Sequence, residues 1–387
     1  SWWARTLKFP VEVNKMGKLR VLVLFGGRSA EHEVSVVSAR AIVGALDPAR
    51  YEVRPVYITR DGRWVLRPAA AWAALEGGPE AALRAAEAGP EPAGKAGLPA
   101  PADPLELAPW AERAPLEVDV AFPVLHGPFG EDGTVQGLLE LAGIPYVGAP
   151  VLGSALGMDK VLMKAVFASR GLPVVPHIYF LARDFRRDPD GVIARVRAEV
   201  GLPCFVKPAN LGSSVGVSKV TRREELGPAV ERAAQYDRKV LVERAINARE
   251  LECSVLGNDD PVASGLGEVV PAREFYDYDA KYRDDRTQLL IPAPVPPEVA
   301  EEVRRLAVAA FKALDLAGMA RVDFFYCRDS DKLYINEVNT IPGFTPVSMY
   351  PKLWEHAGLN FSELVDRLIQ LAIERHQERG RCRNDPD

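Results

Sequence analysis

The chain has 387 residues, of which 48% are apolar and 26% are charged, and its formal net charge is −5. This length allows two or three domains, and the composition is that of an ordinary soluble globular protein. The acidic balance and the lack of a basic aromatic patch argue against a nucleic-acid-binding protein, and the lack of any apolar run of roughly 18–20 residues argues against a membrane-spanning one.

The cysteines and the first residues bear on the compartment. The four cysteines lie far apart and include no C-x-x-C pair: Cys204, Cys253, Cys327 and Cys382. Neither a disulfide scaffold nor a zinc site is expected, and reduced thiols of this kind are typical of a cytoplasmic protein. Residues 1–15 lack the apolar stretch of a signal peptide and directly precede Met16, so we interpret them as an upstream extension.

A strand, a glycine turn and a helix open the first expected unit, residues 16–149. The strand is 19–25, the turn is Gly26-Gly27, and the helix has apolar positions at Val34, Val37, Ala41 and Ala45. This order is typical of nucleotide-binding α/β units, in which a helix N-terminus attracts anions. The G-x-G-x-x-G spacing is missing, so a dinucleotide is not expected. Glu31 at the helix start is either a complement of the helix dipole or a functional group.

The rest of this unit contains further strands, an insertion and a glycine-rich loop. We expect strands at 52–58, 64–66 and 118–123 and a helix at 134–142. Residues 68–115 are rich in Ala, Pro, Gly and Glu, and they predict an insertion with short helices near 70–75 and 80–87. His126 lies in a loop with three glycines that follows the last strand, and such a loop marks the ligand edge of an open α/β sheet.

Two lysines and a loop of small residues mark the second unit, residues 150–242. A helix is expected at 158–169 with Lys160 in its first turn, where a lysine opposes the helix dipole unless an anion compensates. Lys207 lies on a strand at 202–208, and the small residues follow at 211–217. The backbone N–H groups of such a loop can close over phosphates, although a plain hairpin turn gives the same pattern and the Walker A spacing is missing.

The third unit, residues 243–380, combines a strand, a lid and two long helices. Glu243 near the end of a strand at 239–245, followed by Glu250, suits either adenine and ribose contacts or simple exposure to solvent. The aromatic and charged segment within 272–290 predicts an ordered functional loop that acts as a lid. Helices are expected at 297–314 and 361–375, and residues 381–387 are expected to be disordered.

Residues 321–339 predict an antiparallel hairpin, and its polar side chains are the strongest indication of chemistry. Because alternate residues of a strand share a face, Arg321 and Asp323 point one way, and Glu337 and Asn339 point one way. If both pairs face the same side, they converge beneath a cleft. Their hard oxygen ligands are of the kind that Mg²⁺ prefers.

The alternative reading of this hairpin is an ordinary solvated face, which often carries charges at alternate positions. The faces with the charges are expected to carry apolar residues as well, namely Phe325, Leu333 and Ile335. A mixture of ion ligands and apolar side chains favours a cleft that holds a metal-nucleotide and its base.

These motifs together match one family. They are Gly26-Gly27 with Glu31, His126-Gly127 with Glu131-Asp132-Gly133-Thr134, Met158-Asp159-Lys160, Lys207-Pro208 with Gly212-Ser213-Ser214-Val215-Gly216, residues 275–282, Arg321 with Asp323, and Asn336-Glu337 with Asn339, Pro342 and Gly343. They occur in the family's order over about residues 17–375. The chain thus resembles the D-alanine–D-alanine ligases of bacterial cell-wall synthesis, which are members of the ATP-grasp superfamily.

The resemblance implies a fold and a reaction. The fold is the ATP-grasp α/β (α+β) fold, with an N-terminal open parallel α/β domain and two α+β domains that clasp the nucleotide. ATP phosphorylates the carboxylate of one D-alanine, and the amine of a second D-alanine attacks the acyl phosphate to give D-alanyl-D-alanine for peptidoglycan synthesis. The resemblance also implies two Mg²⁺ ions, with Mn²⁺ as an alternative, and a cytoplasmic homodimer with no nucleic-acid or membrane partner.

The resemblance further implies a role for particular residues. The catalytic group is Glu31, Ser213, Tyr282, Arg321 and Gly343. D-alanine would contact Glu31, His126, Arg321, Gly343, Ser348 and Met349. ATP would contact Lys160, Lys207, Ser213, Ser214, Glu243, Arg244, Ile246, Glu250, Lys281 and Phe325. The metal ligands would be Asp323, Glu337 and Asn339.

Two other functions stay open. One is a related carboxylate–amine or depsipeptide ligase with a different acceptor, such as D-lactate or D-serine. Tyr282 favours the dipeptide, because similar ligases that make the D-lactate product carry a histidine there. The other is a nucleotide-binding regulator that has lost turnover, and the complete set of hairpin side chains argues against it.

Overall fold

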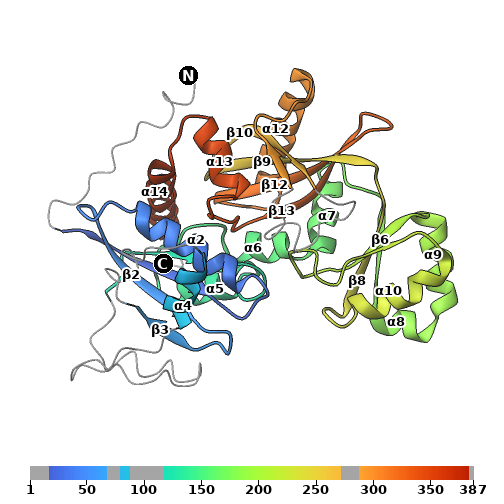
Figure 1. Ribbon diagram of the computed structural model, residues 1–387, viewed down its shortest axis with the longest axis horizontal. Helices are drawn as coiled ribbons and strands as arrows, with labels where there is room; N and C mark the ends of the chain where they lie inside the picture. The colour runs from blue at the N-terminus through green and yellow to red at the C-terminus, as the bar shows by residue number, and fades with distance from the viewer. Residues whose placement is uncertain (1–16, 68–78, 88–116, 272–286, 383–387) are drawn as a thin grey trace.

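The computed structural model describes residues 17–67, 79–87, 117–271 and 287–382 (Figure 1). Several predictions fall outside these ranges: the extension 1–15, the helix near 70–75, most of the insertion, the lid residues Lys281 and Tyr282, and the end of the tail. Figure 1 shows three parts side by side, each built around one sheet.

The first sheet has the strand order β3-β2-β1-β4. Its strands are β1 (Leu19–Gly26), β2 (Tyr51–Ile58), β3 (Trp64–Leu66) and β4 (Val120–Val124). The strands β2, β1 and β4 are parallel as expected, whereas the edge strand β3 is antiparallel to β2. The expected open parallel sheet is confirmed for these three strands, and β3 runs the other way because the short turn at 59–63 reverses the chain and leaves no length for a crossover.

The buried face of the helix α2 (His32–Ala45) coincides only partly with the predicted apolar positions. Val34 is buried as predicted, whereas Val37, Ala41 and Ala45 are only half-buried, and the core is formed instead by Val36, Ala39, Ile42 and Val43. Both sets have helical spacing, so the periodicity alone could not distinguish them. The helix α4 (Pro79–Glu87) contacts α2, and α5 (Thr134–Leu141) follows β4.

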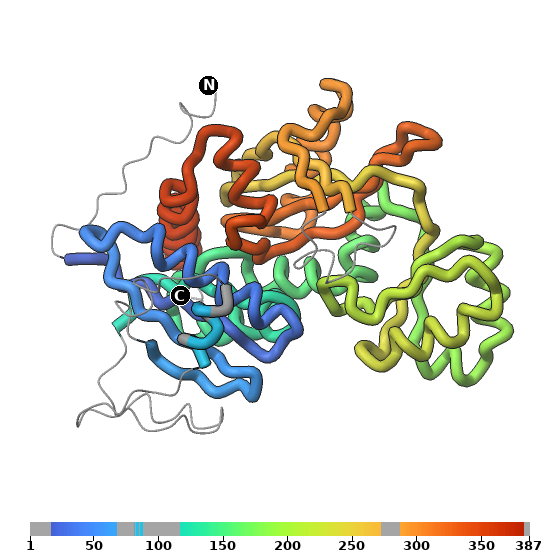
Figure 2. Tube along the Cα trace, in the orientation of Figure 1, coloured from blue at the N-terminus to red at the C-terminus, as the bar shows by residue number. Residues whose placement is uncertain are grey.

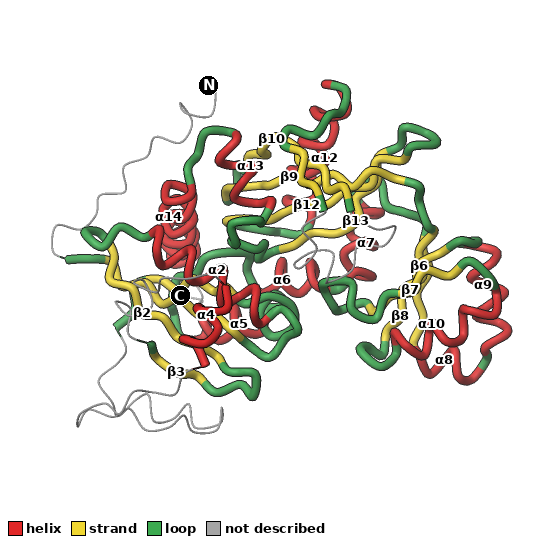
Figure 3. Tube along the Cα trace, in the orientation of Figure 1, coloured by secondary structure: helices red, strands yellow, loops and turns green. Residues whose placement is uncertain are grey.

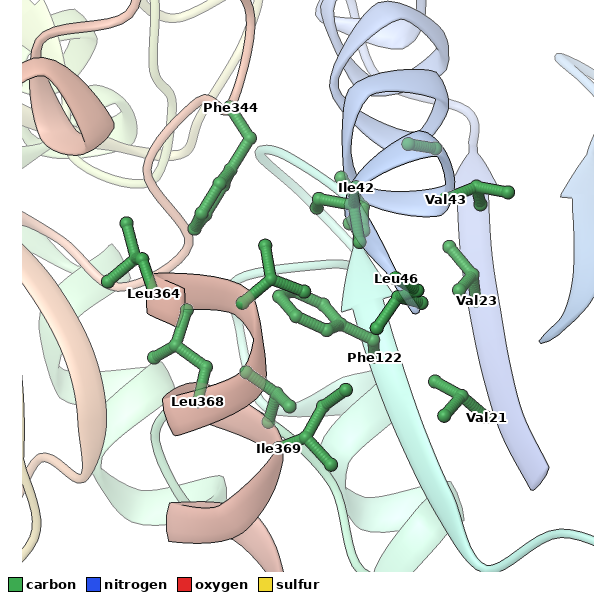
Figure 4. Close-up of a cluster of buried hydrophobic side chains, with 14 of the residues drawn as sticks. Val21, Val23, Ile42, Val43, Leu46, Phe122, Phe344, Leu364, Leu368 and Ile369 are labelled. Atoms are coloured by element: carbon green, nitrogen blue, oxygen red, sulfur yellow. The ribbon is translucent and has the colours of Figure 1, made fainter. Parts of the chain in front are cut away.

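The last helix of the chain completes the core of the first part. Figure 2 shows α14 (Phe361–Gly380), at the red end of the chain, beside the blue N-terminal strands. Leu364, Leu368 and Ile369 of this helix belong to one buried cluster with Phe122 of β4 and Phe344 (Figure 4). The helix is longer than the predicted 361–375, and its buried leucines join the two ends of the sequence.

We expect Leu368→Ala to lower the free energy of unfolding by about 2–5 kcal/mol, because it leaves a cavity among fully buried side chains. Leu141→Ala is the matched control, since Leu141 is 91% exposed, and its effect should stay within about 0.5 kcal/mol. Urea unfolding of both variants measures the difference. Equal stabilities of the two variants would contradict the packing of α14 on the first sheet.

The second sheet forms the smaller part and has the strand order β5-β8-β6-β7, with every pair antiparallel. Its strands are β5 (His177–Leu181), β6 (Cys204–Pro208), β7 (Ser218–Val220) and β8 (Lys239–Arg244). The helices α8 (Ala182–Arg187), α9 (Pro189–Glu199) and α10 (Leu226–Ala233) pack against it (Figure 3). The division expected after residue 242 falls inside β8, which belongs wholly to this sheet.

The third sheet is the central one, with the order β11-β10-β9-β12-β13. Its strands are β9 (Ala248–Gly257), β10 (Val262–Val270), β11 (Gln288–Leu290), β12 (Gly318–Cys327) and β13 (Leu333–Asn339). The helix expected at 297–314 is α12 (Pro297–Ala313), which packs on this sheet, and α13 (Met349–His356) contacts β9 and β10.

The predicted helix at 158–169 is present as α7 (Lys160–Ser169), and it is the second of two consecutive helices, because α6 (Val151–Met158), which was not predicted, ends at Asp159 just before it. The Asp159 side chain accepts hydrogen bonds from the N–H groups of Val161 and Leu162, so it caps the second helix. Met163 and Phe167 of α7 pack in the core of the central sheet, which places Lys160 beside that sheet.

The sequence also led to expectations about the cysteines and about membrane-spanning segments. The four cysteines lie within the described residues, and all of them are free thiols. In the same ranges, no helix combines the length and the apolar character needed to cross a lipid bilayer.

Candidate active site

The polar side chains of the β12–β13 hairpin converge as predicted. Arg321 pairs with Asn339 in the register, and Asp323 pairs with Glu337. The Arg321 guanidinium donates to both carboxylate oxygens of Asp323, at 2.7 and 2.8 Å, and Asn339 Nδ2 donates to Asp323 at 2.9 Å. The hairpin therefore presents a connected set of charged and amide groups on one face.

A β-bulge sets the direction of Glu337. The register shifts after Asp323, so that Phe324 pairs with Ile335 and Asn336 has no counterpart on β12. Ile335 is fully buried with Phe324 in the core, and Leu333 packs against the same core. The expectation that Leu333 and Ile335 share the face of Glu337 is wrong, because one extra residue reverses the alternation along the strand.

A cavity of about 90 Å³ lies next to this face. Its lining combines the three parts of the molecule: Glu31, Val34, His126, Glu131, Gly212, Ser213, Glu252, Val269, Leu289, Arg321, Glu337, Asn339, Ile341, Pro342, Gly343, Thr345, Val347, Ser348 and Met349. The described residues predicted to contact D-alanine all line it. Among the residues that the structure describes, those predicted to contact only ATP lie outside it.

Glu31 connects the first part of the molecule to the loop of small residues. Ser213 Oγ donates to Glu31 Oε1 at 2.5 Å. Ser213 and Ser214 both adopt left-handed backbone angles, with φ of 51° and 57°. Gly212 lies so close to Glu31 that a Cβ there would be 3.2 Å from Oε2, so the loop between β6 and β7 is pressed onto the start of α2.

His126 and Glu131 are buried at the wall of the cavity. His126 Nδ1 lies 2.9 Å from the Ile341 carbonyl oxygen, and Glu131 accepts from the N–H groups of Gly127 and Ile341, at 2.8 and 3.0 Å. Burial lowers the pKa of His126, so the neutral ring donates through Nδ1–H and Nε2 is an acceptor. Burial, together with the charge of Glu31, raises the pKa of Glu131 to about 7.

The segment before α13 also lines the cavity. Ser348 is the N-cap residue of that helix, and its Oγ accepts from the Thr345 N–H at 3.0 Å. A Cβ on Gly343 would lie 2.7 Å from this Oγ, so only glycine fits there without displacing Ser348. The first N–H groups of a helix attract a carboxylate, and Met349 begins α13.

Lys160 has the anionic partner that its position at a helix start requires. Its Nζ lies 3.1 Å from Glu337 Oε2 and donates to the Leu211 carbonyl oxygen at 2.9 Å. Burial tends to lower the pKa of Lys160, but the charge of Glu337 outweighs it and raises that pKa. Lys160 therefore stays charged between the hairpin and the small-residue loop.

The reading of Glu243 as a solvent-exposed glutamate is wrong. It is only 2% exposed, and its carboxylate forms ion pairs with Lys207 and with Lys164 of α7, the latter at 2.7 Å. Burial would raise the pKa of Glu243, but the two lysines outweigh it and lower the pKa to about 2. A nucleotide would therefore meet a carboxylate that is already paired.

The remaining residues predicted to contact ATP lie at the junction of the second and third sheets. Arg244 is exposed at the end of β8, and its Nε donates to the Val200 carbonyl oxygen at 2.9 Å. Ile246 follows in the connection to β9. Glu250 of β9 is directly opposite Phe325 of β12, and both are half-buried.

The sequence prediction assigned no role to three charged residues of this region. Glu252 of β9 lies 3.0 Å from the Arg321 guanidinium, Glu131 lines the cavity, and Lys164 pairs with Glu243. Two of them had a signal in the sequence. Glu252 has strand spacing from Glu250, and Lys164 has helical spacing from Lys160.

The hairpin has the donor chemistry that Mg²⁺ requires. Across the described ranges, no group of three or more His, Cys, Asp and Glu side chains is placed to hold a metal ion. A site at the hairpin would use the carboxylates of Asp323 and Glu337 and the amide oxygen of Asn339. Such an all-oxygen set fits Mg²⁺, and its assignment as a metal site stays a prediction.

Comparison with known proteins identifies the same family in the N-terminal and C-terminal parts of the chain. The family model described as "D-ala D-ala ligase N-terminus" matches residues 20–149, and "D-ala D-ala ligase C-terminus" matches residues 166–370. The D-alanine–D-alanine ligase of a Thermoanaerobacter species (strain X514) is 52% identical over 367 residues, 95% of this chain and 99% of the relative. That of Geobacillus thermodenitrificans is 49% identical over 363 residues, 94% and 97% of the two chains.

Solved structures agree with the sequence comparison. The D-alanine–D-alanine ligase of Coxiella burnetii superposes with a TM-score of 0.76 at 36% identity, covering 94% of this chain and 96% of the other. The VanG D-Ala:D-Ser ligase of Enterococcus faecalis superposes with a TM-score of 0.75 at 34% identity, covering 92% and 100%.

Proposed function

The chain belongs to the D-alanine–D-alanine ligase family, and from this membership we propose how it joins two molecules of D-alanine with ATP as co-substrate. It is a ligase with the ATP-grasp fold. The observation that carries the proposed mechanism is the convergence of Arg321, Asp323, Glu337 and Asn339 beside a cavity that Glu31 and Ser348 also line.

The reaction begins with activation of a carboxylate. A free carboxylate is a poor acyl donor, so the γ-phosphate of ATP is transferred to the first D-alanine, which gives an acyl phosphate and ADP. The amine of the second D-alanine attacks the acyl carbon, and phosphate leaves from the tetrahedral intermediate. The protein's contribution is to position the reactants and to offset developing negative charge.

The walls of the cavity supply complementary groups for the two amino acids. The Glu31 carboxylate takes the ammonium group of the first D-alanine, and His126 Nε2 offers a neighbouring acceptor. Arg321 and the Gly343 N–H stabilise the oxyanion at the reacting carbon. The Ser348 hydroxyl and the Met349 N–H take the carboxylate of the second D-alanine, where the start of α13 favours negative charge.

The nucleotide lies between the second and third sheets in this proposal. Lys160 and Lys207 contact the phosphates, and the N–H groups of the small-residue loop, including Ser213 and Ser214, close over them. The base and ribose lie against Glu243, Arg244, Ile246, Glu250 and Phe325. The lid residues Lys281 and Tyr282 are assigned to γ-phosphate binding and to closure against water.

Two Mg²⁺ ions complete the assignment. The oxygens of Asp323, Glu337 and Asn339 would hold them, and Lys160 would share Glu337 with them. When bound, such ions neutralise phosphate charge during transfer. We further propose that the enzyme acts as a cytoplasmic homodimer in peptidoglycan precursor synthesis.

Phosphate release with D-alanine or L-alanine, followed by identification of the product, tests the function. Release that depends on D-alanine, with D-alanyl-D-alanine as the product, is the expected result. A depsipeptide or a D-serine product as the main species with mixed acceptors would instead indicate a ligase of different acceptor specificity. An absence of phosphate release with D-alanine and Mg²⁺ would indicate a regulator that binds nucleotides without turnover.

Ser213→Ala is expected to raise the KM for the first D-alanine about tenfold or more, because a hydrogen bond to a charged group contributes about 1.5–3 kcal/mol. The variant loses the bond that fixes the Glu31 carboxylate. Initial rates at fixed ATP and varied D-alanine measure the change. Ser169→Ala is the control, since its exposed hydroxyl donates to the carbonyl of Val166 in its own helix. Equal KM values for the two variants would contradict the role of Glu31.

A further inference from the structure

Lys164 is a fully buried lysine without an assigned role in the proposed reaction. It extends from α7, is 0% exposed, and contacts both neighbouring sheets. Its Nζ lies 2.7 Å from Glu243 Oε1 on β8 of the second sheet and donates to the Asn336 carbonyl oxygen on β13 of the third sheet at 2.9 Å. Burying an ammonium group is costly, so its two partners must compensate for the lost water.

The contact with Asn336 occurs at the β-bulge of the hairpin. The bulge takes Asn336 out of the pairing with β12, and it turns Glu337 toward the cavity while Ile335 enters the core. An unpaired residue in a sheet leaves polar backbone groups to be satisfied. Lys164 supplies a charged donor to the carbonyl at this position, which stabilises the bulge in the form that directs Glu337.

The contact between Lys164 and Glu243 limits how far the Glu243 carboxylate neutralises the positive charge of Lys207. Lys207 and Lys164 share this one carboxylate, so the group of three carries a net charge of +1. Without Lys164, the carboxylate would neutralise Lys207 completely. Lys207 would then have little net attraction for a polyanion, although its position would be unchanged.

We propose that Lys164 is a positioning residue for the triphosphate of ATP: it balances the charge of Glu243 so that Lys207, although paired with Glu243, keeps a net attraction for phosphate, and it holds the bulge that directs Glu337. This inference rests on the proposed function, because it takes ATP as the ligand between the two sheets. The atoms of Lys164 contact other protein groups and reach the nucleotide only through them.

Equilibrium binding of ATP and of adenosine to Lys164→Met tests the charge effect without turnover. Methionine fills a similar volume without charge. The dissociation constant for ATP should rise about tenfold, equivalent to about 1.4 kcal/mol, while that for adenosine, which lacks phosphate, should change less than about twofold. Equal weakening of both ligands would indicate a general distortion of the site and would overturn the proposal, as would unchanged ATP binding.

The double variant Lys164→Met/Glu243→Gln distinguishes an effect of net charge on ATP binding from an effect of structural distortion. It restores a net charge of +1 at Lys207, so the ratio of ATP to adenosine affinity should recover toward the wild-type ratio. A further fall in that ratio would contradict the charge argument. Lys312→Met, at an exposed position of α12, is the control for loss of one positive charge. Wild-type protein that fails to bind ATP would refute the proposed function itself, a result distinct from a negative result with the variants.

Discussion

Replacing Glu337 by glutamine is expected to lower the turnover number by about 10³-fold or more, because it removes a charged group from the site where phosphate charge develops. The carboxylate lies at the bulge of the central hairpin, opposite Asp323 and 3.1 Å from Lys160 Nζ. Glutamine has nearly the same shape, so the side chain can occupy the same position. It cannot balance the charge of Lys160 or serve as an anionic metal ligand.

The measurement is phosphate release at saturating ATP and D-alanine, accompanied by thermal unfolding of the same preparation. The folded state should persist, since Glu337 is only part-buried and lies at the cavity rather than in the core. Glu301→Gln is the matched control, because this glutamate is exposed on α12 and pairs with Arg304 of the same helix. Near-normal turnover by the Glu337 variant would refute the metal assignment, whereas loss of cooperative unfolding would show a structural role instead.

The convergence at the hairpin could be predicted because it depends on local rules. Two runs of β-branched and aromatic residues around a polar turn specify a hairpin, and the period of two then fixes which side chains share a face. Arg321 and Asp323 are on the same strand before the bulge, so strict alternation places them correctly. The strand, glycine turn and helix at the N-terminus follow from equally short-range patterns.

The errors in the prediction arise where neighbouring elements decide the outcome. Nothing in residues 333–339 indicates that Asn336 leaves the register, because the bulge is stabilised by Phe324 and Ile335 in the core and by Lys164 from another helix. The stripe of α2 that faces the core is likewise chosen by the sheet beneath it. Tertiary packing overrides periodicity in both cases.

The burial of Lys164 and Glu243 was also not predicted, and the reason is different. Hydrophobicity places Lys164 and Glu243 on the surface, since lysine and glutamate are almost never fully buried unless they are paired. The pairing joins residues of different sheets and helices, so it appears only once α7 packs between them. The start of α7 after Asp159, which brings Lys160 and Lys164 to this place, agrees with the predicted helix, but the start alone does not show what the two lysines contact.

Arg321→Lys is expected to lower the turnover number by about 10²-fold or more with little change in the KM for ATP, because removal of one oxyanion donor has an effect of this size. The guanidinium group donates to both oxygens of Asp323, at 2.7 and 2.8 Å, and lies 3.0 Å from Glu252. Its planar fork can hold these carboxylates and still direct an N–H toward the cavity. A lysine keeps the charge but offers a single nitrogen at a different position.

Separate measurement of the turnover number and of the KM for ATP distinguishes the proposed role from its alternatives. A residue that stabilises only the transition state lowers turnover, whereas one that binds the nucleotide raises the KM. Arg304→Lys, on the exposed face of α12, controls for the exchange of guanidinium for ammonium. An increase in the KM for ATP at unchanged turnover would indicate that Arg321 binds the nucleotide and does not act at the reacting carbon. The convergence of the hairpin side chains would then be a nucleotide site without the proposed oxyanion chemistry.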